Sequence, residues 1–151
     1  MAVIVGELAP DFTLEDQNGL SFHLNSILGT ESIILYFYPK DETPGCVKEA
    51  CGFRDNFKEF ENLNYRIIGI SKDSVDSHAK FAKHHNLPYT LLSDSSKTVV
   101  NLYGVESSLL GLLPGRKTFV IDKNGVVTHI FDYQFKAKQH VADALKAISN
   151  E

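Results

Sequence analysis

The chain has 151 residues, of which 43% are hydrophobic and 23% charged, and its formal net charge is −4. This length and composition predict one compact globular domain that covers residues 1–151. The mixed charges and the negative balance argue against nucleic acid as the main partner, because phosphate binding requires a basic surface. The longest apolar run, residues 33–38, is far too short to cross a bilayer, so no membrane partner is expected.

The N-terminal residues have no basic leader and only a short apolar run. Such a start does not fit a secretory signal, and it predicts a cytoplasmic protein. The chain contains two cysteines, Cys46 and Cys51. A domain of this size in a reducing compartment needs no structural disulfide, which leaves redox chemistry and plain burial as the two interpretations of the pair.

The first predicted element is a hairpin. Residues 12–14 and 22–24 flank the step Asn18-Gly19, and Asn-Gly is a strong signal for a tight turn between two strands. Residues 32–38 then form a dense β-branched and aromatic run, which is typical of a buried central strand, and residues 65–71 form a second one.

One helix is predicted between these two central strands. Apolar residues recur there at helical spacing, at positions 50, 53, 57 and 60. Thr43 is suited to the N-cap and Pro44 to the first helical position. A strand, a helix and a strand in this order predict a right-handed crossover between two parallel strands.

The second half of the chain continues the alternation of helices and strands. Helices are predicted over residues 76–85, with Asp73 or Ser74 as the cap, over 98–103 and over 138–148. Strands are predicted over 87–92, 118–121 and 126–131, the last two joined by a hairpin at residues 122–125. The predicted fold class is therefore α/β: a mixed sheet with helices on both faces and an added N-terminal β-hairpin.

Cys46 is the third residue of the helix that Thr43 would cap. Its sulfur would lie near unpaired backbone N–H groups and the positive end of the helix dipole, and both stabilise a thiolate over a thiol. The thiolate is the reactive form of cysteine. Position alone leaves an inert, buried cysteine as an equally good interpretation.

The surrounding sequence favours chemistry. Residues 37–55 read FYPKDETPGCVKEACGFRD, which contains the pattern Pro-x-x-x-Thr-x-x-Cys directly after a buried strand. This segment resembles the active-site signature of the peroxiredoxins, and in particular their peroxiredoxin Q (bacterioferritin comigratory protein) branch. Further similar blocks follow the same order at residues 10–12, 70–74 and 116–122. The resemblance covers essentially the whole chain and implies a thioredoxin-like fold.

The resemblance also implies a role for each site residue. Cys46 is the peroxidatic nucleophile, which attacks one peroxide oxygen and becomes a sulfenic acid. Thr43 donates its hydroxyl to the thiolate or to the bound peroxide, and Pro39 shields the sulfur from water. Arg116 lies beside the sulfur and stabilises negative charge there. Glu49 orients Arg116.

The resemblance assigns Cys51 the resolving role, in which it forms a disulfide with Cys46. In an intact helix the Cα atoms of residues i and i+5 lie about 8.6 Å apart. A disulfide needs Cα atoms within about 7 Å. We therefore expect residues 43–52 to unfold locally after oxidation, which Gly45 and Gly52 would ease. The alternative for Cys51 is a small core residue, with an external thiol as the resolving group.

Two further signals carry less weight. The six histidines are scattered except for His84-His85, and a Cys-x4-Cys spacing does not match the usual zinc pairs, so no metal is expected. The implied peroxidase needs no cofactor, because sulfur does the redox work itself. The apolar residues 109–114 fit a core-facing turn or the lining of an alkyl-peroxide pocket. The peroxiredoxin Q branch commonly has a tryptophan where this chain has Glu106, which leaves the shape of that pocket open.

The resemblance implies a two-cysteine peroxidase for hydrogen peroxide and organic hydroperoxides, active in antioxidant defence. Thioredoxin or a glutaredoxin-like dithiol protein would reduce its disulfide, and the protein would be a monomer. Two other functions stay open. A thioredoxin-type oxidoreductase would carry Cys-x-x-Cys, which this chain lacks. A non-enzymatic α/β binding module would hold both cysteines inert.

Overall fold

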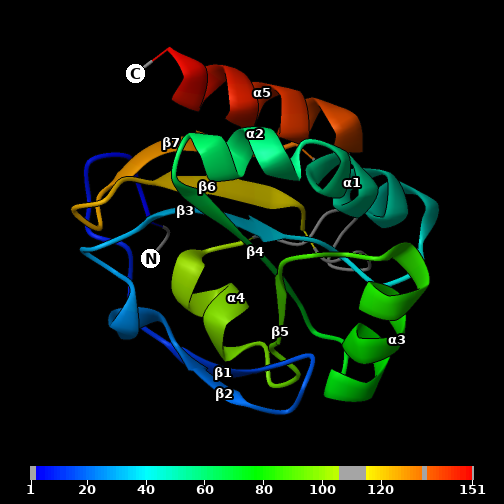
Figure 1. Cartoon of the computed structure of the whole chain (residues 1–151). Helices are drawn as coiled ribbons and strands as arrows, with labels where there is room; N and C mark the ends of the chain where they lie inside the picture. Colours follow the sequence, from blue (N-terminus) through cyan, green and yellow to red (C-terminus); the bar gives the residue numbers. More distant parts are fainter. Residues whose placement is uncertain (1–2, 106–114, 134–135, 151) are drawn as a thin grey trace.

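The computed structural model describes residues 3–105, 115–133 and 136–150, and its centre is a seven-stranded mixed sheet (Figure 1). The strand order is β2-β1-β5-β4-β3-β6-β7. The strands are β1 (Thr13–Asp16), β2 (Ser21–His23), β3 (Ser32–Phe37), β4 (Tyr65–Ser71), β5 (Thr90–Ser93), β6 (Lys117–Ile121) and β7 (Val127–Phe131). The helices are α1 (Pro44–Asp55), α2 (Phe57–Asn62), α3 (Val75–His85), α4 (Thr98–Tyr103) and α5 (Ala137–Ser149), with a short 3-10 turn at Leu24–Ser26.

The central strand β3 pairs in parallel with β4 and antiparallel with β6. Its side chains alternate between two cores, as the period of a strand requires. Ile33, Leu35 and Phe37 pack into one core, and Ile34 and Tyr36 into the other. Both faces of β3 are buried, which explains why its sequence is apolar throughout rather than alternating.

Helices cover both faces of the sheet (Figure 1). Helices α1, α2 and α5 contribute side chains to the core that contains Tyr36, whereas α4 contributes Val99 and Tyr103 to the core that contains Phe37. Helix α3 packs at the β5 end of the sheet. Among the described residues, no helix is long and apolar enough to cross a membrane.

The structure confirms the mixed α/β fold, the N-terminal hairpin, the parallel crossover from β3 to β4 and the hairpin of β6 and β7. The single helix predicted after β3 is wrong, because α1 and α2 are separated at Asn56. The Asn56 side-chain amide donates to the Gly52 carbonyl at 2.8 Å, a local bond that competes with regular helix geometry.

The predicted start of the fifth strand is also wrong. We expected it at residue 87, but β5 begins at Thr90. Asn86 ends α3 in the left-handed conformation, and the Leu87 N–H bonds back to the Ala82 carbonyl at 2.9 Å. Leu87 therefore completes the helix cap, and Pro88 has no N–H to offer to a sheet.

Candidate active site

The start of α1 lies directly beyond the end of β3 and places Cys46 at the third helical position. Thr43 has the extended backbone of an N-cap residue (φ −82°, ψ 148°), as predicted. Its hydroxyl, however, donates to the Lys40 carbonyl at 2.8 Å instead of serving a helix amide. The Thr43 side chain therefore fixes the loop before the helix and does not cap a helix N–H group.

Arg116 reaches Cys46 through the register of the sheet. Phe37, the last residue of β3, pairs with Lys117, the first residue of β6. Arg116 therefore lies beside the loop that follows β3, although it is 70 residues from Cys46 in sequence. Its Nη2 atom donates to Cys46 Sγ at 3.4 Å, and both side chains are buried. A cation that cannot lose its proton thus faces the sulfur in a site with little water.

Glu49 holds the other branch of the same guanidinium. It lies three residues after Cys46, on the same face of α1, and its Oε1 accepts a hydrogen bond from Arg116 Nη1. The Glu49 side chain is fully buried, and its Oε2 has no hydrogen-bond partner among the described residues. Burial raises the pKa of Glu49 to about 8, although the charge and hydrogen bond of Arg116 act in the opposite direction.

A second layer of polar groups, absent from the sequence-based predictions, lies behind Glu49. His140 Nδ1 lies 3.8 Å from Glu49 Oε2 and 2.8 Å from the Thr118 hydroxyl, and His140 Nε2 lies 2.7 Å from the Tyr133 carbonyl. Burial, with a smaller contribution from the charge of Arg116, lowers the pKa of His140. If the His140 ring is neutral and donates from Nε2 to the Tyr133 carbonyl, its Nδ1 accepts a hydrogen bond from the Thr118 hydroxyl. The helical spacing of apolar residues in α5 places His140 on the buried stripe, a signal that could have identified it.

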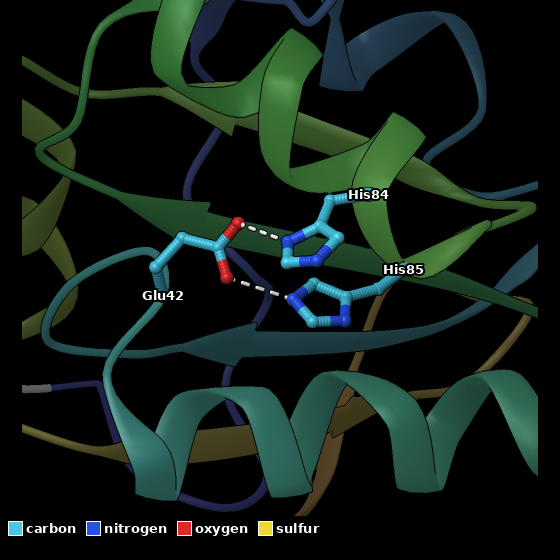
Figure 2. Close-up of side chains that lie close together, drawn as sticks. All are labelled: Glu42, His84 and His85. Carbon is cyan, nitrogen blue, oxygen red and sulfur yellow. Dashed lines mark hydrogen bonds and ion pairs between the residues drawn. The ribbon is translucent and has the colours of Figure 1, made fainter.

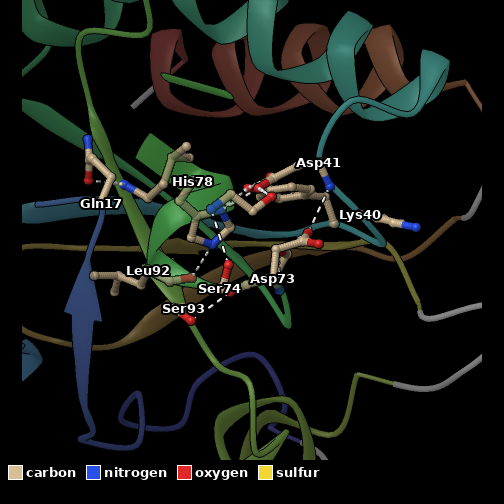
Figure 3. A network of polar contacts seen from close by, with 12 residues as sticks. Gln17, Lys40, Asp41, Asp73, Ser74, His78, Leu92 and Ser93 are labelled. Atoms are coloured by element: carbon tan, nitrogen blue, oxygen red, sulfur yellow. Dashed lines mark hydrogen bonds and ion pairs between the residues drawn. The ribbon is translucent and has the colours of Figure 1, made fainter. Parts of the chain in front are cut away.

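A buried polar network anchors the loop between β3 and α1 (Figure 3). Asp41 accepts hydrogen bonds from Tyr38 Oη at 2.7 Å and Ser77 Oγ at 2.8 Å, and its Oδ2 lies 2.7 Å from His78 Nδ1. Its backbone N–H donates to Asp73 Oδ2 at 2.8 Å. The sequence analysis did not identify this network, because its members come from three separate elements. It ties the active-site loop to α3.

Cys51 lies on the other side of α1 from this constellation. It is half-buried and lines a groove of about 550 Å³ between α1 and α5, together with Val47, Val141 and Leu145. Burial raises the pKa of the Cys51 thiol, an effect that the charges of Asp55 and Glu42 increase and that of Arg54 opposes. Cys46 and Cys51 are both free thiols within the intact α1.

The structure therefore brings Cys46, Arg116 and Glu49 together and leaves Cys51 outside the cluster. Pro39 is buried at the end of β3, in the loop that carries Thr43. The shielding role of Pro39 and the donor role of Thr43 stay predictions. Residues 106 and 109–114, considered as a pocket lining, lie outside the described residues.

The two glycines of α1 occupy tight positions. A Cβ atom on Gly45 would lie 3.1 Å from Arg116 Nη2, and a Cβ atom on Gly52 would lie 3.0 Å from Val141 Cγ2. The sequence analysis attributed flexibility to both. Close packing is a second reason for a glycine at each position, because Arg116 and α5 approach the helix backbone there.

Comparison with known proteins identifies relatives along nearly the whole chain. Residues 5–130 match the AhpC/TSA family. The chloroplastic peroxiredoxin Q of Triticum aestivum is 48% identical over 145 residues, which cover 96% of this chain and 66% of that protein. The chain thus spans slightly less than two thirds of the length of this relative. The crystal structure of peroxidoxin BcpB from Mycobacterium tuberculosis is 40% identical, with a TM-score of 0.88 and coverage of 97% of this chain and 96% of that one. The bacterioferritin comigratory protein of Xanthomonas campestris is 29% identical, with a TM-score of 0.83 over 92% of this chain and 90% of that one.

These relatives correct the predicted location. The proteins from wheat, rice, Sedum lineare and Arabidopsis thaliana are all named chloroplastic, which contradicts the predicted cytoplasmic location. The prediction relied on the first residues of the chain. Those residues are a poor guide, because the location of a protein is set by a targeting signal that its folded domain need not contain.

Proposed function

The chain belongs to the AhpC/TSA family and, within it, to the peroxiredoxin Q branch, and from this premise we propose that it is a thiol-dependent peroxidase. Its substrates would be hydrogen peroxide and organic hydroperoxides, and its role antioxidant defence. The relative from Xanthomonas campestris is described by its alkyl peroxide reduction activity, which supports the organic substrates. The observation that carries the proposal is the contact of Arg116 with both Cys46 and Glu49.

In the first step the Cys46 thiolate attacks one oxygen of the peroxide. An S–O bond forms, the O–O bond breaks, and the leaving oxygen takes up a proton to become water or an alcohol. Negative charge moves from the sulfur onto the leaving oxygen, and Arg116 lies where it can stabilise this charge. Cys46 is left as a sulfenic acid. Thr43 would contribute its hydroxyl once that group exchanges its bond to Lys40, and Pro39 would limit access of water.

In the second step the Cys51 thiolate attacks the Cys46 sulfur. The S–S bond forms, and the hydroxyl of the sulfenic acid leaves as water after it takes up a proton. Both cysteines belong to α1, and residues five apart in an intact helix are too far apart for a disulfide. The first turns of α1 therefore unwind before this bond forms. A dithiol protein of the thioredoxin or glutaredoxin class then reduces the disulfide, and the protein works as a monomer.

The test mixes fully reduced protein with one equivalent of hydrogen peroxide and follows thiol loss by stopped flow. The wild type should lose two thiols per peroxide and form the Cys46–Cys51 disulfide. Cys46→Ser should react no faster than a free thiol, a loss of roughly three orders of magnitude or more. Cys51→Ser should retain the rate of the first step and accumulate a sulfenic acid that dimedone traps.

The same experiment separates the alternatives. Reduction of insulin disulfides without rapid reaction with peroxide would indicate a thioredoxin-type oxidoreductase. Equal, slow thiol loss in the wild type and in Cys46→Ser would indicate a non-enzymatic module and would refute the peroxidase. An α1 that keeps its circular-dichroism signal and its amide protection in the disulfide form would refute the local unfolding.

A further inference from the structure

Three metal-ligating side chains converge on the surface beside α1 (Figure 2). Glu42 Oε2 lies 2.8 Å from His84 Nδ1, and Glu42 Oε1 lies 2.8 Å from His85 Nε2. One ligand atom from each of the three residues lies within 4.8 Å of the others. The carboxylate comes from the loop before α1 and the two rings from the last turn of α3, so the fold joins residues more than 40 positions apart.

The backbone holds this arrangement in place. Glu42 has a left-handed backbone (φ 61°), a conformation that is strained for a non-glycine residue. This conformation turns the carboxylate toward α3, as Figure 2 shows. The neighbouring Asp41 is bound to Ser77 and His78 of α3, so the loop is already fixed one residue away. The three groups are therefore positioned before any ion arrives.

We propose that Glu42, His84 and His85 form a binding site for a divalent transition-metal ion of the zinc class. Two imidazole nitrogens and one carboxylate oxygen are ligands that zinc accepts in a site with one open position. His84 is well exposed and Glu42 half-exposed, so an ion can enter from solvent. A metal was not expected here, because the sequence shows two adjacent histidines more than 40 residues away from the carboxylate that completes the set.

The position of the site gives it a consequence for α1. Glu42 directly precedes Thr43, the N-cap residue of α1. At the other end of the helix, Arg54 Nη1 donates to the His85 carbonyl at 2.7 Å. A bound ion would tie the loop before α1 to the C-terminal end of α3. The bond from Arg54 already ties the last turn of α1 to that same end of α3. The occupied site should therefore oppose the unwinding of α1 and slow formation of the Cys46–Cys51 disulfide, a consequence that depends on the proposed peroxidase function.

The binding test uses zinc alone, titrated against the Cys46→Ser/Cys51→Ser double variant so that thiols cannot act as ligands. Glu42→Gln, His84→Asn and His85→Asn in this background should each weaken zinc binding by at least about tenfold. His23→Asn removes an exposed histidine outside the cluster and is the matched control, with no change expected. Equal affinity in all five proteins, or an equal loss in His23→Asn, would refute the site.

Nuclear magnetic resonance of the ring nitrogens provides a sharper signature. The geometry predicts that zinc binds Nδ1 of His84 and Nε2 of His85, so the two rings should show opposite tautomers in long-range ¹H–¹⁵N spectra. Zinc-dependent shifts of other histidines, with none for this pair, would also refute the site.

The consequence for α1 is tested on the wild type by the rate of disulfide formation after one equivalent of peroxide, with and without zinc. Glu42→Gln without zinc is the reference for charge, because removal of the Glu42 charge alone favours the Cys51 thiolate. Zinc should slow disulfide formation in the wild type several-fold, to a rate below that of the zinc-free wild type and below that of Glu42→Gln. Zinc should not change the rate of disulfide formation in Glu42→Gln. Zinc binding with an unchanged or faster rate would refute the restraint on α1. Absence of any reaction with peroxide would refute the peroxidase function. It would not affect the zinc titration, which does not depend on that function.

Discussion

The two cysteines of α1 share one helix but lie in contrasting surroundings. Cys46 is buried and faces a guanidinium that Glu49 holds from the other side. Cys51 is half-buried in an open groove, where burial raises the pKa of its thiol. A guanidinium that can stabilise negative charge lies at the first sulfur, whereas burial favours the thiol form of the second.

This contrast indicates how one short helix can serve two steps in order. The face that carries Cys46 depends on the contact with Arg116, the residue just before β6, and this contact is present while the helix is intact. Cys51 lies outside this contact, in the groove toward α5, so in the proposed second step it reaches the Cys46 sulfur only after the first turns of α1 unwind. The following changes test whether the two faces are independent.

Arg116→Met should have the largest effect, on the Cys46 side. It removes the cation that donates to the sulfur, and we expect the rate constant for hydrogen peroxide to fall by roughly a hundredfold, as for the loss of one donor to a developing anion. Stopped-flow mixing measures this rate. Arg116→Lys retains the charge but cannot contact Cys46 and Glu49 together, so it should recover only part of the loss. Full activity in Arg116→Met would show that the contact is structural only.

Glu49→Gln should change the pH dependence of stability. The unfolded chain releases the Glu49 proton near pH 4.5, and the folded chain retains it up to about pH 8. The contribution of Glu49 to the free energy of unfolding is therefore fully present below pH 4.5 and is lost as the pH rises through 8. We expect a loss of about 4 kcal/mol between pH 5 and pH 9 in the wild type, measured by urea titration. Most of this dependence of the free energy of unfolding on pH should disappear in Glu49→Gln. The same dependence in both proteins would contradict the raised pKa of Glu49.

Gly45→Ala should have the smallest effect. The new Cβ atom would press on Arg116 Nη2 and shift the guanidinium by a few tenths of an ångström. We expect the rate of the peroxide reaction to fall several-fold. Gly52→Ala is the matched control on the other face, because it makes the same change in helix propensity but contacts Val141. An equal fall in both variants would show that helix stability, and not the position of Arg116, sets the rate.

Local sequence signals were reliable where a single segment decides the structure. The runs at 32–38 and 65–71 identified the two central strands, and Thr43-Pro44 located the start of α1 to the residue. The break at Asn56 and the late start of β5 were missed, because each follows from one competing hydrogen bond. Patterns of apolar residues average over such single contacts.

The sequence by itself determined the α/β fold class, the position of Cys46 near a helix start and the family signature around it. The resemblance also implied that Arg116 meets Cys46, and the tertiary structure shows that the register of β3 and β6 brings them together. Only the tertiary structure decided the other meetings of distant groups: His140 behind Glu49, and Glu42 with His84 and His85. The physical reason is that periodicity and capping act over a few neighbouring residues. The neighbours of a buried charge or an exposed carboxylate are set by how separate strands and helices pack.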